Sequence, residues 1–268
     1  MTKIKVQLNP DTPPTGSDLS VVNAARRSFG KRSEWVYSGV DTNGPHEKAL
    51  KAKDKRLLEF LARGMTAGDF KSFTKKLGKT DWTYVDGAYD LVDLLWQWRN
   101  TPIHDTPFNH GFISFEVKAP IFVRAQLVKH EYLIMSEFSR RYITDDVEFY
   151  EPDYWRKAAP NKKQGSLEEP VHEGLYMEYQ YDDAKQEVLD RYRRMLAQGV
   201  APEQARMALP QSLMTAWTWS GTLGAFAKMC QLRCHPEAQY EARIVADEVY
   251  KHLKDYWPVA APALVEGV

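Results

Sequence analysis

The sequence has little cysteine and no long apolar run. Its 268 residues include two cysteines, Cys230 and Cys234, which are too few for a disulfide framework and favour a reducing compartment. The opening MTKIKVQLNPDTPP holds no apolar core of signal-peptide length, and no stretch approaches the ~18 apolar residues of a membrane helix. We therefore expect a soluble intracellular protein, located in the cytoplasm.

An excess of charge of either sign is also missing. Lys and Arg total 36, as do Asp and Glu, so the formal net charge is +0. This balance argues against a general nucleic-acid binder, because such proteins neutralise many phosphates with basic residues. A local basic cluster can still hold one small anion. The 43% hydrophobic content suffices for one large domain or two small ones.

The sequence also lacks the motifs of a phosphate-binding loop, a zinc site and a catalytic cysteine. Gly221 and Gly224 in GTLGAF lack the spacing of a Rossmann fingerprint or a P-loop. Cys234 precedes His235, and neighbours on a helix point about 100° apart, which is a poor geometry for a Cys–His pair. With Cys230 these residues could supply three zinc ligands, but in none of the usual patterns. We expect inert thiols and no metal.

Periodicity and chain breakers predict both helices and strands. A strand is expected from 111, where Phe112 and Ser114 alternate with Ile113 and Phe115, until Pro120 ends it. A second strand is expected over 212–220, and 151–170 reads as a polar loop. Helices are expected over 19–30, 46–64, 121–135, 171–198, 202–209, 221–233 and 236–257. Without strict βαβ alternation, the pattern favours an α+β or irregular α/β fold. Residues 65–100 read as peripheral.

The segment HDTPFNH has two readings. His104, Asp105 and His110 resemble a metal cluster, but their spacing fits no helical ligand face, and Pro107 keeps the segment irregular. It is either a capped turn leading into the strand at 111 or a turn whose polar groups face a bound ring system.

Arginines in apolar surroundings carry the clearest signal. These are Arg140, Arg141, Arg206 and Arg233, with Ser139 and Gln126 as possible hydrogen-bond partners. A guanidinium forks onto phosphate and lies flat against a planar base, so the set suits a nucleotide. Arg140 and Arg141 are neighbours, and we expect one of them to be structural.

Six segments together resemble the flavin-dependent thymidylate synthases. In chain order they are DLSVVNAARRSFG, HDTPFNHGFISFEVKAPIFVRAQLVKH, SEFSRRY, NKKQGS, ARMALP and LRCHPEAQYE, which run from about residue 18 to 245. The resemblance implies a single α/β domain over 1–268 with a mixed sheet and long flanking helices, assembled as a homotetramer with interfacial active sites. It implies reductive methylation of dUMP to dTMP, with 5,10-methylenetetrahydrofolate as carbon donor, FAD as redox carrier and NADPH as reductant.

The same resemblance assigns site residues by position. For dUMP it implies Gln126, Lys129, Glu137, Ser139, Arg140, Arg141, Arg206 and Arg233, with Arg233 polarising the pyrimidine as the catalytic residue. For FAD and folate it implies Ser28, His104, Thr106, Lys129, His130, Glu131, Glu137, Thr222, Gly224 and Lys228.

The flavin side departs from the family pattern. The usual Arg-His-Arg is Lys129-His130-Glu131 here, and Thr222 and Gly224 stand where the family often has Asn and Arg. Lysine lacks the bidentate fork of arginine, and Glu131 reverses a charge. Two alternatives therefore stay open: a pyrimidine deoxynucleotide hydroxymethyltransferase on the same fold, and a non-catalytic nucleotide-binding homologue.

Overall fold

The structure is a computed structural model that describes residues 3–38, 47–64, 102–160 and 165–266, with a few residues between 68 and 75. The chain divides into two compact units. Unit 1 comprises Met1–Asp11, Ser114–Ser220 and Leu232–Glu248, and unit 2 comprises Thr12–Ile113, Gly221–Gln231 and Val249–Val268. A single domain over 1–268 stays a prediction, and the segment 65–100 lies almost wholly outside the described residues.

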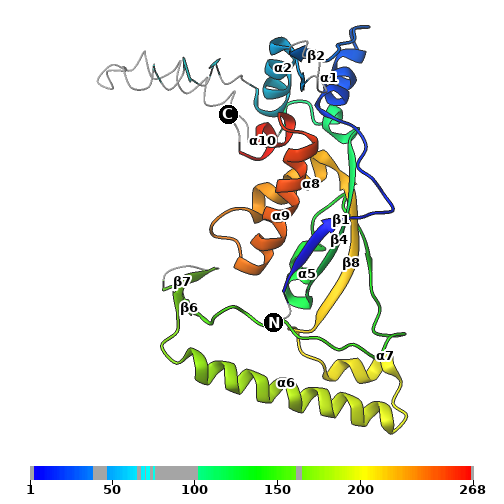
Figure 1. Cartoon of the computed structure of the whole chain (residues 1–268), viewed down its shortest axis with the longest axis vertical. Coiled ribbons are helices and arrows are strands. Elements are labelled where there is room, and N and C mark those ends of the chain that lie inside the picture. Colours follow the sequence, from blue (N-terminus) through cyan, green and yellow to red (C-terminus); the bar gives the residue numbers. More distant parts are fainter. Residues whose placement is uncertain are drawn as a thin grey trace. The chain divides into compact units, whose positions relative to one another are not determined.

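A four-stranded sheet forms the centre of unit 1. Its strands β1 (Lys5–Leu8), β4 (Phe112–Pro120), β8 (Met214–Thr222) and β5 (Ile134–Glu137) lie in the order β1-β4-β8-β5 (Figure 1). Both outer pairs are antiparallel. Alternation along the strands buries Val117 and Trp217 on one face and leaves Lys118 and Thr218 on the other. Helices combined with a sheet confirm the expected fold class.

The helix α6 (Gly174–Ala197) of unit 1 is packed along one side only. Tyr181 donates its hydroxyl hydrogen to the carbonyl of Tyr150 at 2.6 Å, and Lys185 pairs with Glu151 at 2.7 Å. Its first turns nevertheless expose Leu175 by 85%. The remaining elements of this unit are α5 (Ile121–Leu127), β6 (Arg156–Ala158), β7 (Ser166–Pro170), α7 (Pro202–Ala205), η2 (Arg206–Ala208) and the first half of α9 (Tyr240–Tyr256).

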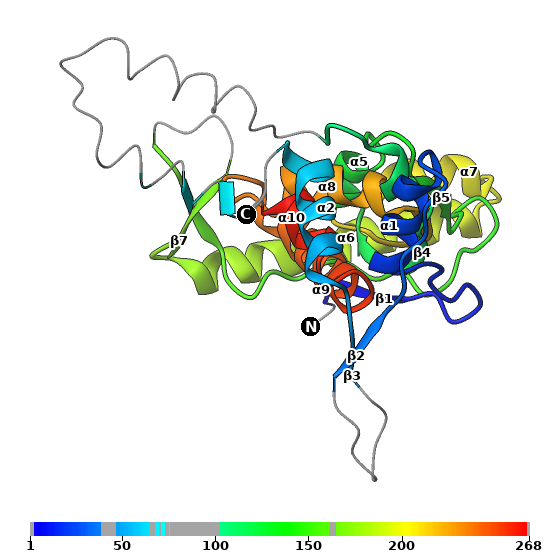
Figure 2. The same ribbon diagram turned by 90° about the horizontal axis from the view of Figure 1, so that it is seen from above.

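Unit 2 is mainly helical. It holds α1 (Asp18–Arg27), β2 (Val36–Ser38), β3 (Glu47–Ala49), α2 (Ala52–Arg63), η1 (Thr106–Asn109), most of α8 (Leu223–Arg233) and α10 (Ala260–Val265). Helix α2 packs against α10 (Figure 2), and the guanidinium of Arg63 donates to the carbonyl of Ala263 at 2.9 Å. The Asp18 carboxylate accepts from the backbone N–H groups of Val259 and Ala260 at 2.8 and 2.9 Å. Burial raises the pKa of Asp18 to about 6, although these two hydrogen bonds oppose the rise.

Most predicted elements are confirmed with shifted ends. Ser17 caps the first helix, and Gly64 ends α2 with φ +85°, a left-handed conformation that suits glycine. The helices predicted over 171–198, 221–233 and 236–257 and the strands predicted from 111 and over 212–220 are all present. Pro210 follows the short helical stretch 202–208, as expected.

Three predictions were wrong. The helix expected over 121–135 ends at Leu127, and Ile134–Glu137 instead forms β5, which pairs with Trp217–Ser220 of β8 after a turn in which Tyr132 has φ +64°. The expected loop 151–170 contains the hairpin strands β6 and β7. The helix expected over 46–64 begins only at Ala52, because 47–49 forms β3. In each case the segment pairs with another strand, and local propensity does not reveal such pairing.

Across the described ranges we find no helix with the length and apolar content that crossing a membrane requires.

Candidate functional site

An arginine-lined cavity of about 420 Å³ lies in unit 1. Its walls contain the end of β5, the segment after it and the region of η2. The lining includes five of the residues predicted to hold a nucleotide: Glu137, Ser139, Arg140, Arg141 and Arg206. Three arginines face one glutamate, so the cavity has the charge that an anion requires.

The three arginines differ in what they bond. Arg140 is buried and donates to the carbonyls of Asp145 and Asp146, the latter at 2.7 Å, so it holds the following loop together. Arg141 and Arg206 are exposed, and their hydrogen bonds in the described structure use Nε, to the Ser139 hydroxyl at 3.4 Å and to the Glu203 carbonyl at 3.2 Å. Their terminal nitrogens are therefore available for an anion.

Glu137 is held in place on the wall of this cavity. Its carboxylate accepts from the Thr215 hydroxyl at 3.0 Å and pairs with the Arg124 guanidinium at 2.7 Å. Two partners from different elements fix the carboxylate, so it can orient a ligand hydroxyl or a neighbouring arginine without moving.

A hydrogen bond joins Arg233 to His130. Nε of Arg233 donates to Nε2 of His130 at 3.0 Å, where His130 follows α5 and Arg233 ends α8. Burial and the neighbouring Arg233 cation lower the pKa of His130 to about 4. The imidazole is therefore neutral near pH 7, with its proton on Nδ1 and the Nε2 lone pair aimed at the guanidinium.

Gln126 belongs to a separate chain of polar groups. Its side-chain amide donates to Oε1 of Gln239, whose own amide donates to the Glu241 carboxylate at 3.1 Å. Glu241 is 5% exposed and is paired with Arg156, which also donates to the Ser166 hydroxyl at 2.8 Å. Gln239, Glu241, Arg156 and Ser166 line a cavity of about 340 Å³ with several aromatic rings.

The residues predicted to face the flavin fall mostly in unit 2. Ser28, His104 and Thr106 are exposed, and Thr106 begins η1, so HDTPFNH forms the expected turn before β4. Thr222 donates to Oδ1 of Asn109 at 2.6 Å and accepts from the backbone N–H of Ala225, which caps α8.

Gly224 is covered by Asn109. A Cβ at Gly224 would lie 2.6 Å from Oδ1 of Asn109, so the glycine is what makes room for the asparagine. The hydroxyl of Thr222 is engaged by the same side chain. Neither position therefore offers an open polar group, whereas the exposed hydroxyl and imidazole groups of Ser28, Thr106 and His104 have the chemistry that a flavin's carbonyl, ring-nitrogen and phosphate groups require.

Lys129, Glu131 and Lys228 are exposed, and the arginine-lined cavity includes none of these three described residues. Sequence reasoning missed Asn109, Gln239, Glu241 and Arg156. The motif AQYE in LRCHPEAQYE contains Gln239 and Glu241, but only the fold shows that Gln239 bonds both to Gln126 and to Glu241.

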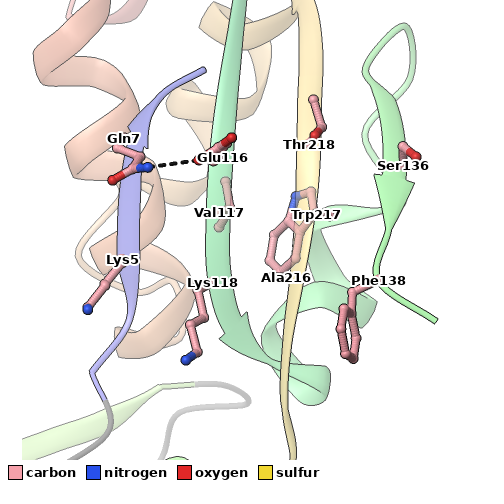
Figure 3. A pocket seen from close by; sticks show the side chains of 10 residues that line it. All are labelled: Lys5, Gln7, Glu116, Val117, Lys118, Ser136, Phe138, Ala216, Trp217 and Thr218. Atoms are coloured by element: carbon pink, nitrogen blue, oxygen red, sulfur yellow. Dashed lines mark hydrogen bonds between the residues drawn. The ribbon is translucent and has the colours of Figure 1, made fainter. Parts of the chain in front are cut away.

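A cavity of about 480 Å³ follows the open face of the sheet and shares Phe138 with the arginine-lined cavity. Figure 3 shows Gln7 of β1 donating to Glu116 of β4, a bond of 2.7 Å, with residues of all four strands around it. None of the described residues that line it was predicted as a site residue. Elsewhere in the described part of the chain, no cluster of three His, Cys, Asp or Glu side chains is placed to hold a metal ion.

Sheet, helices and cavity define an α/β protein with an arginine-lined anion site. A model of the family described as "Thymidylate synthase complementing protein" matches residues 12–259, and the chain belongs to this family.

Two relatives support this placement, and one solved structure shares the fold. The flavin-dependent thymidylate synthase of a Thermus thermophilus strain is 37% identical over 180 residues, which are 66% of this chain and 63% of that protein. The flavin-dependent thymidylate synthase of Wolbachia pipientis is 35% identical over 255 residues, 94% of this chain and 71% of that protein. The crystal structure of a UMP/dUMP methylase from Streptomyces cacaoi bound with 5-Br dUMP has a TM-score of 0.71, 23% identity and coverage of 99% of this chain and 96% of that one, so it shares the fold.

Proposed function

We propose that this protein is a flavin-dependent thymidylate synthase of the cytoplasm. It converts dUMP to dTMP, with 5,10-methylenetetrahydrofolate as carbon donor, FAD as redox cofactor and NADPH as reductant. The observation that carries the proposal is the arginine-lined cavity of unit 1, found in a chain of the thymidylate synthase complementing family. That cavity has the positive charge and the guanidinium terminal nitrogens, on Arg141 and Arg206, that a nucleotide phosphate needs.

The nucleotide is held by eight residues: Gln126, Lys129, Glu137, Ser139, Arg140, Arg141, Arg206 and Arg233. Arg141 and Arg206 bind the phosphate, Ser139 adds a hydroxyl, and Arg140 keeps the loop of the cavity in shape. Arg233 is the catalytic residue. Its guanidinium, held by neutral His130, stabilises the negative charge that develops on a pyrimidine carbonyl oxygen when the ring accepts hydride.

FAD and folate contact a second group of residues: Ser28, His104, Thr106, Lys129, His130, Glu131, Glu137, Thr222, Gly224 and Lys228. Ser28, His104 and Thr106 are the exposed hydrogen-bonding groups that would hold FAD. The chemistry that bound FAD would supply at these residues is redox: it would make the hydride of NADPH available for the pyrimidine. His130 offers Nδ1–H as its remaining donor, because Nε2 already accepts from Arg233.

The proposed assembly is a homotetramer with interfacial active sites. Its support is an apolar patch on α6, where Leu175, Tyr176 and Tyr179 are exposed by 85%, 56% and 68%. Apolar side chains at neighbouring helical positions mark interaction surfaces when they cluster in this way. Light scattering should give a mass four times that of the chain, and Leu175→Glu should lower it.

The test is the mass of the product. Purified protein is incubated with dUMP, methylenetetrahydrofolate, FAD and NADPH, and we expect dTMP. Arg141→Met should raise the KM for dUMP, because the phosphate loses a charge partner. The spectrum of the purified protein should show a flavin that NADPH bleaches.

A product with the mass of 5-hydroxymethyl-dUMP would contradict this proposal and favour the hydroxymethyltransferase. The observation that motivates the alternative is the altered flavin side, where Asn109 covers Gly224 and engages Thr222. Protein that stays colourless with added FAD but binds dUMP would favour the non-catalytic homologue.

A further inference from the structure

The amide of Gln126 has its orientation fixed from a distance. It stands at one end of the hydrogen-bonded chain Gln126–Gln239–Glu241–Arg156, all of which lies in unit 1. A glutamine side chain can ordinarily turn its amide over, because oxygen and nitrogen are nearly equal in size. The series of hydrogen bonds removes that freedom, because each bond fixes the orientation of the next side chain.

The fixed end is Arg156. A guanidinium only donates hydrogen bonds, so the Glu241 carboxylate paired with it is held as an acceptor. Gln239 must then turn its NH₂ group toward Glu241, as it does at 3.1 Å, and this places its carbonyl oxygen toward Gln126. Gln126 can meet a carbonyl oxygen only with its own NH₂ group. Its carbonyl oxygen and one N–H are left for a ligand.

Burial makes this orientation costly to reverse. Glu241 is 5% exposed, and Gln126 and Gln239 are half-buried, so water cannot readily replace a lost partner. Inverting Gln126 would set two oxygen atoms against each other and leave a donor unpaired. Such a penalty corresponds to a factor on the order of 10 or more in the population of the inverted amide.

We propose that Gln239, Glu241 and Arg156 determine which pyrimidine the site accepts, by holding the Gln126 amide so that it pairs with the lactam edge of uracil and excludes cytosine. This inference rests on the proposed function, in which Gln126 contacts the nucleotide. Uracil presents an N3–H donor beside a C4 carbonyl acceptor, and cytosine presents the reverse, an N3 acceptor beside an N4 amino donor. One amide orientation matches one of these edges, and the other edge needs the amide inverted. Gln239, Glu241 and Arg156 are thus positioning residues that act through Gln126.

Two variants test the orientation of the Gln126 amide: the first frees it, and the second inverts it. Gln239→Met has a similar length but no hydrogen-bonding group, so Gln126 loses its partner while the pair between Arg156 and Glu241 is kept. Glu241→Gln keeps its amide oxygen toward Arg156 and therefore turns its NH₂ group toward Gln239, which inverts the amides of positions 239 and 126. Lys157→Met is the matched control, because Lys157 is an exposed residue of β6 whose partner is Glu169.

The experiment measures the dissociation constants of dUMP and dCMP by calorimetry for the four proteins, with thermal unfolding as a check that each is folded. We expect wild type and Lys157→Met to bind dUMP more tightly than dCMP by on the order of 10-fold or more, the range of one bidentate base contact. Gln239→Met should bring the ratio within about 3-fold, mainly through tighter binding of dCMP, because a freely turning amide can serve either edge. Glu241→Gln should reverse the preference in favour of dCMP, because its Gln126 amide is inverted.

Three results separate success from failure. Folded Gln239→Met that keeps the wild-type ratio would overturn the inference, as would a wild type that binds both nucleotides equally. Because Gln239→Met leaves the buried ion pair intact, it decides the question even if Glu241→Gln does not fold. A wild type that binds neither nucleotide would instead contradict the proposed function.

Discussion

The lowered pKa of His130 predicts a specific dependence of stability on pH. The histidine side chain of an unfolded chain has a pKa of 6.5, whereas the pKa of folded His130 is lowered to about 4, because the imidazole is buried beside Arg233. A folded-state pKa below the unfolded value gives stability that is present above pH 6.5 and is lost as the pH falls towards 4. For these two values, lowering the pH from 7.5 to 5 costs about 2 kcal/mol of unfolding free energy through this one group.

The assay compares wild type with His130→Gln by urea unfolding at both pH values. Glutamine keeps an acceptor for Arg233 but does not titrate, so the wild type should lose about 2 kcal/mol more than the variant on acidification. Asp18, whose pKa is raised to about 6, acts in the opposite sense, but it is present in both proteins and cancels in the difference. His172→Gln, at an exposed position, is the matched control for exchanging a histidine for glutamine. Equal losses in wild type and His130→Gln would refute a buried neutral imidazole.

Three further substitutions have defined outcomes. Arg233→Ala should abolish turnover and leave the unfolding midpoint within a few degrees of wild type; near-normal activity would remove Arg233 from its catalytic role. Gly111→Ala should lower the unfolding free energy by about 1–3 kcal/mol, because a Cβ there would lie 2.6 Å from the Trp257 ring, and an unchanged urea midpoint would contradict that close contact. Asp18→Ala should lower the unfolding free energy by about 1–2 kcal/mol, because the two N–H groups at the start of α10 lose their acceptor. Thermal unfolding followed by circular dichroism measures this loss, and an unchanged melting temperature would contradict it.

The sequence allowed prediction of elements that carry their own local signals. The helical segments predicted over 46–64 and 202–209 end within one residue of the observed positions, where Gly64 and Pro210 act on the backbone within one turn. The strand β5 was mistaken for helix because YLIMSE has no local preference strong enough to reveal its pairing with β8. Such pairing is a property of the whole sheet.

Site prediction met the same limit. Residues 137–141 of SEFSRRY lie close in sequence and line one cavity, so their grouping could be foreseen. The bond from His130 to Arg233 spans 103 positions, and the bond from Gln126 to Gln239 spans 113. No periodicity relates residues so far apart, and only the fold supplies those partners.

The pairing of β1 with β4 has a consequence for how the chain is made. Lys5 of β1 lies opposite Lys118 of β4. During synthesis, more than a hundred further residues must therefore be added after β1 before its partner strand exists. At about 5–20 residues per second, that interval is on the order of ten seconds. During it, the N–H and C=O groups of β1 are open to pairing with other nascent chains. The positive charge of Lys5, which side-by-side copies would repeat, discourages such pairing while the chain is still growing.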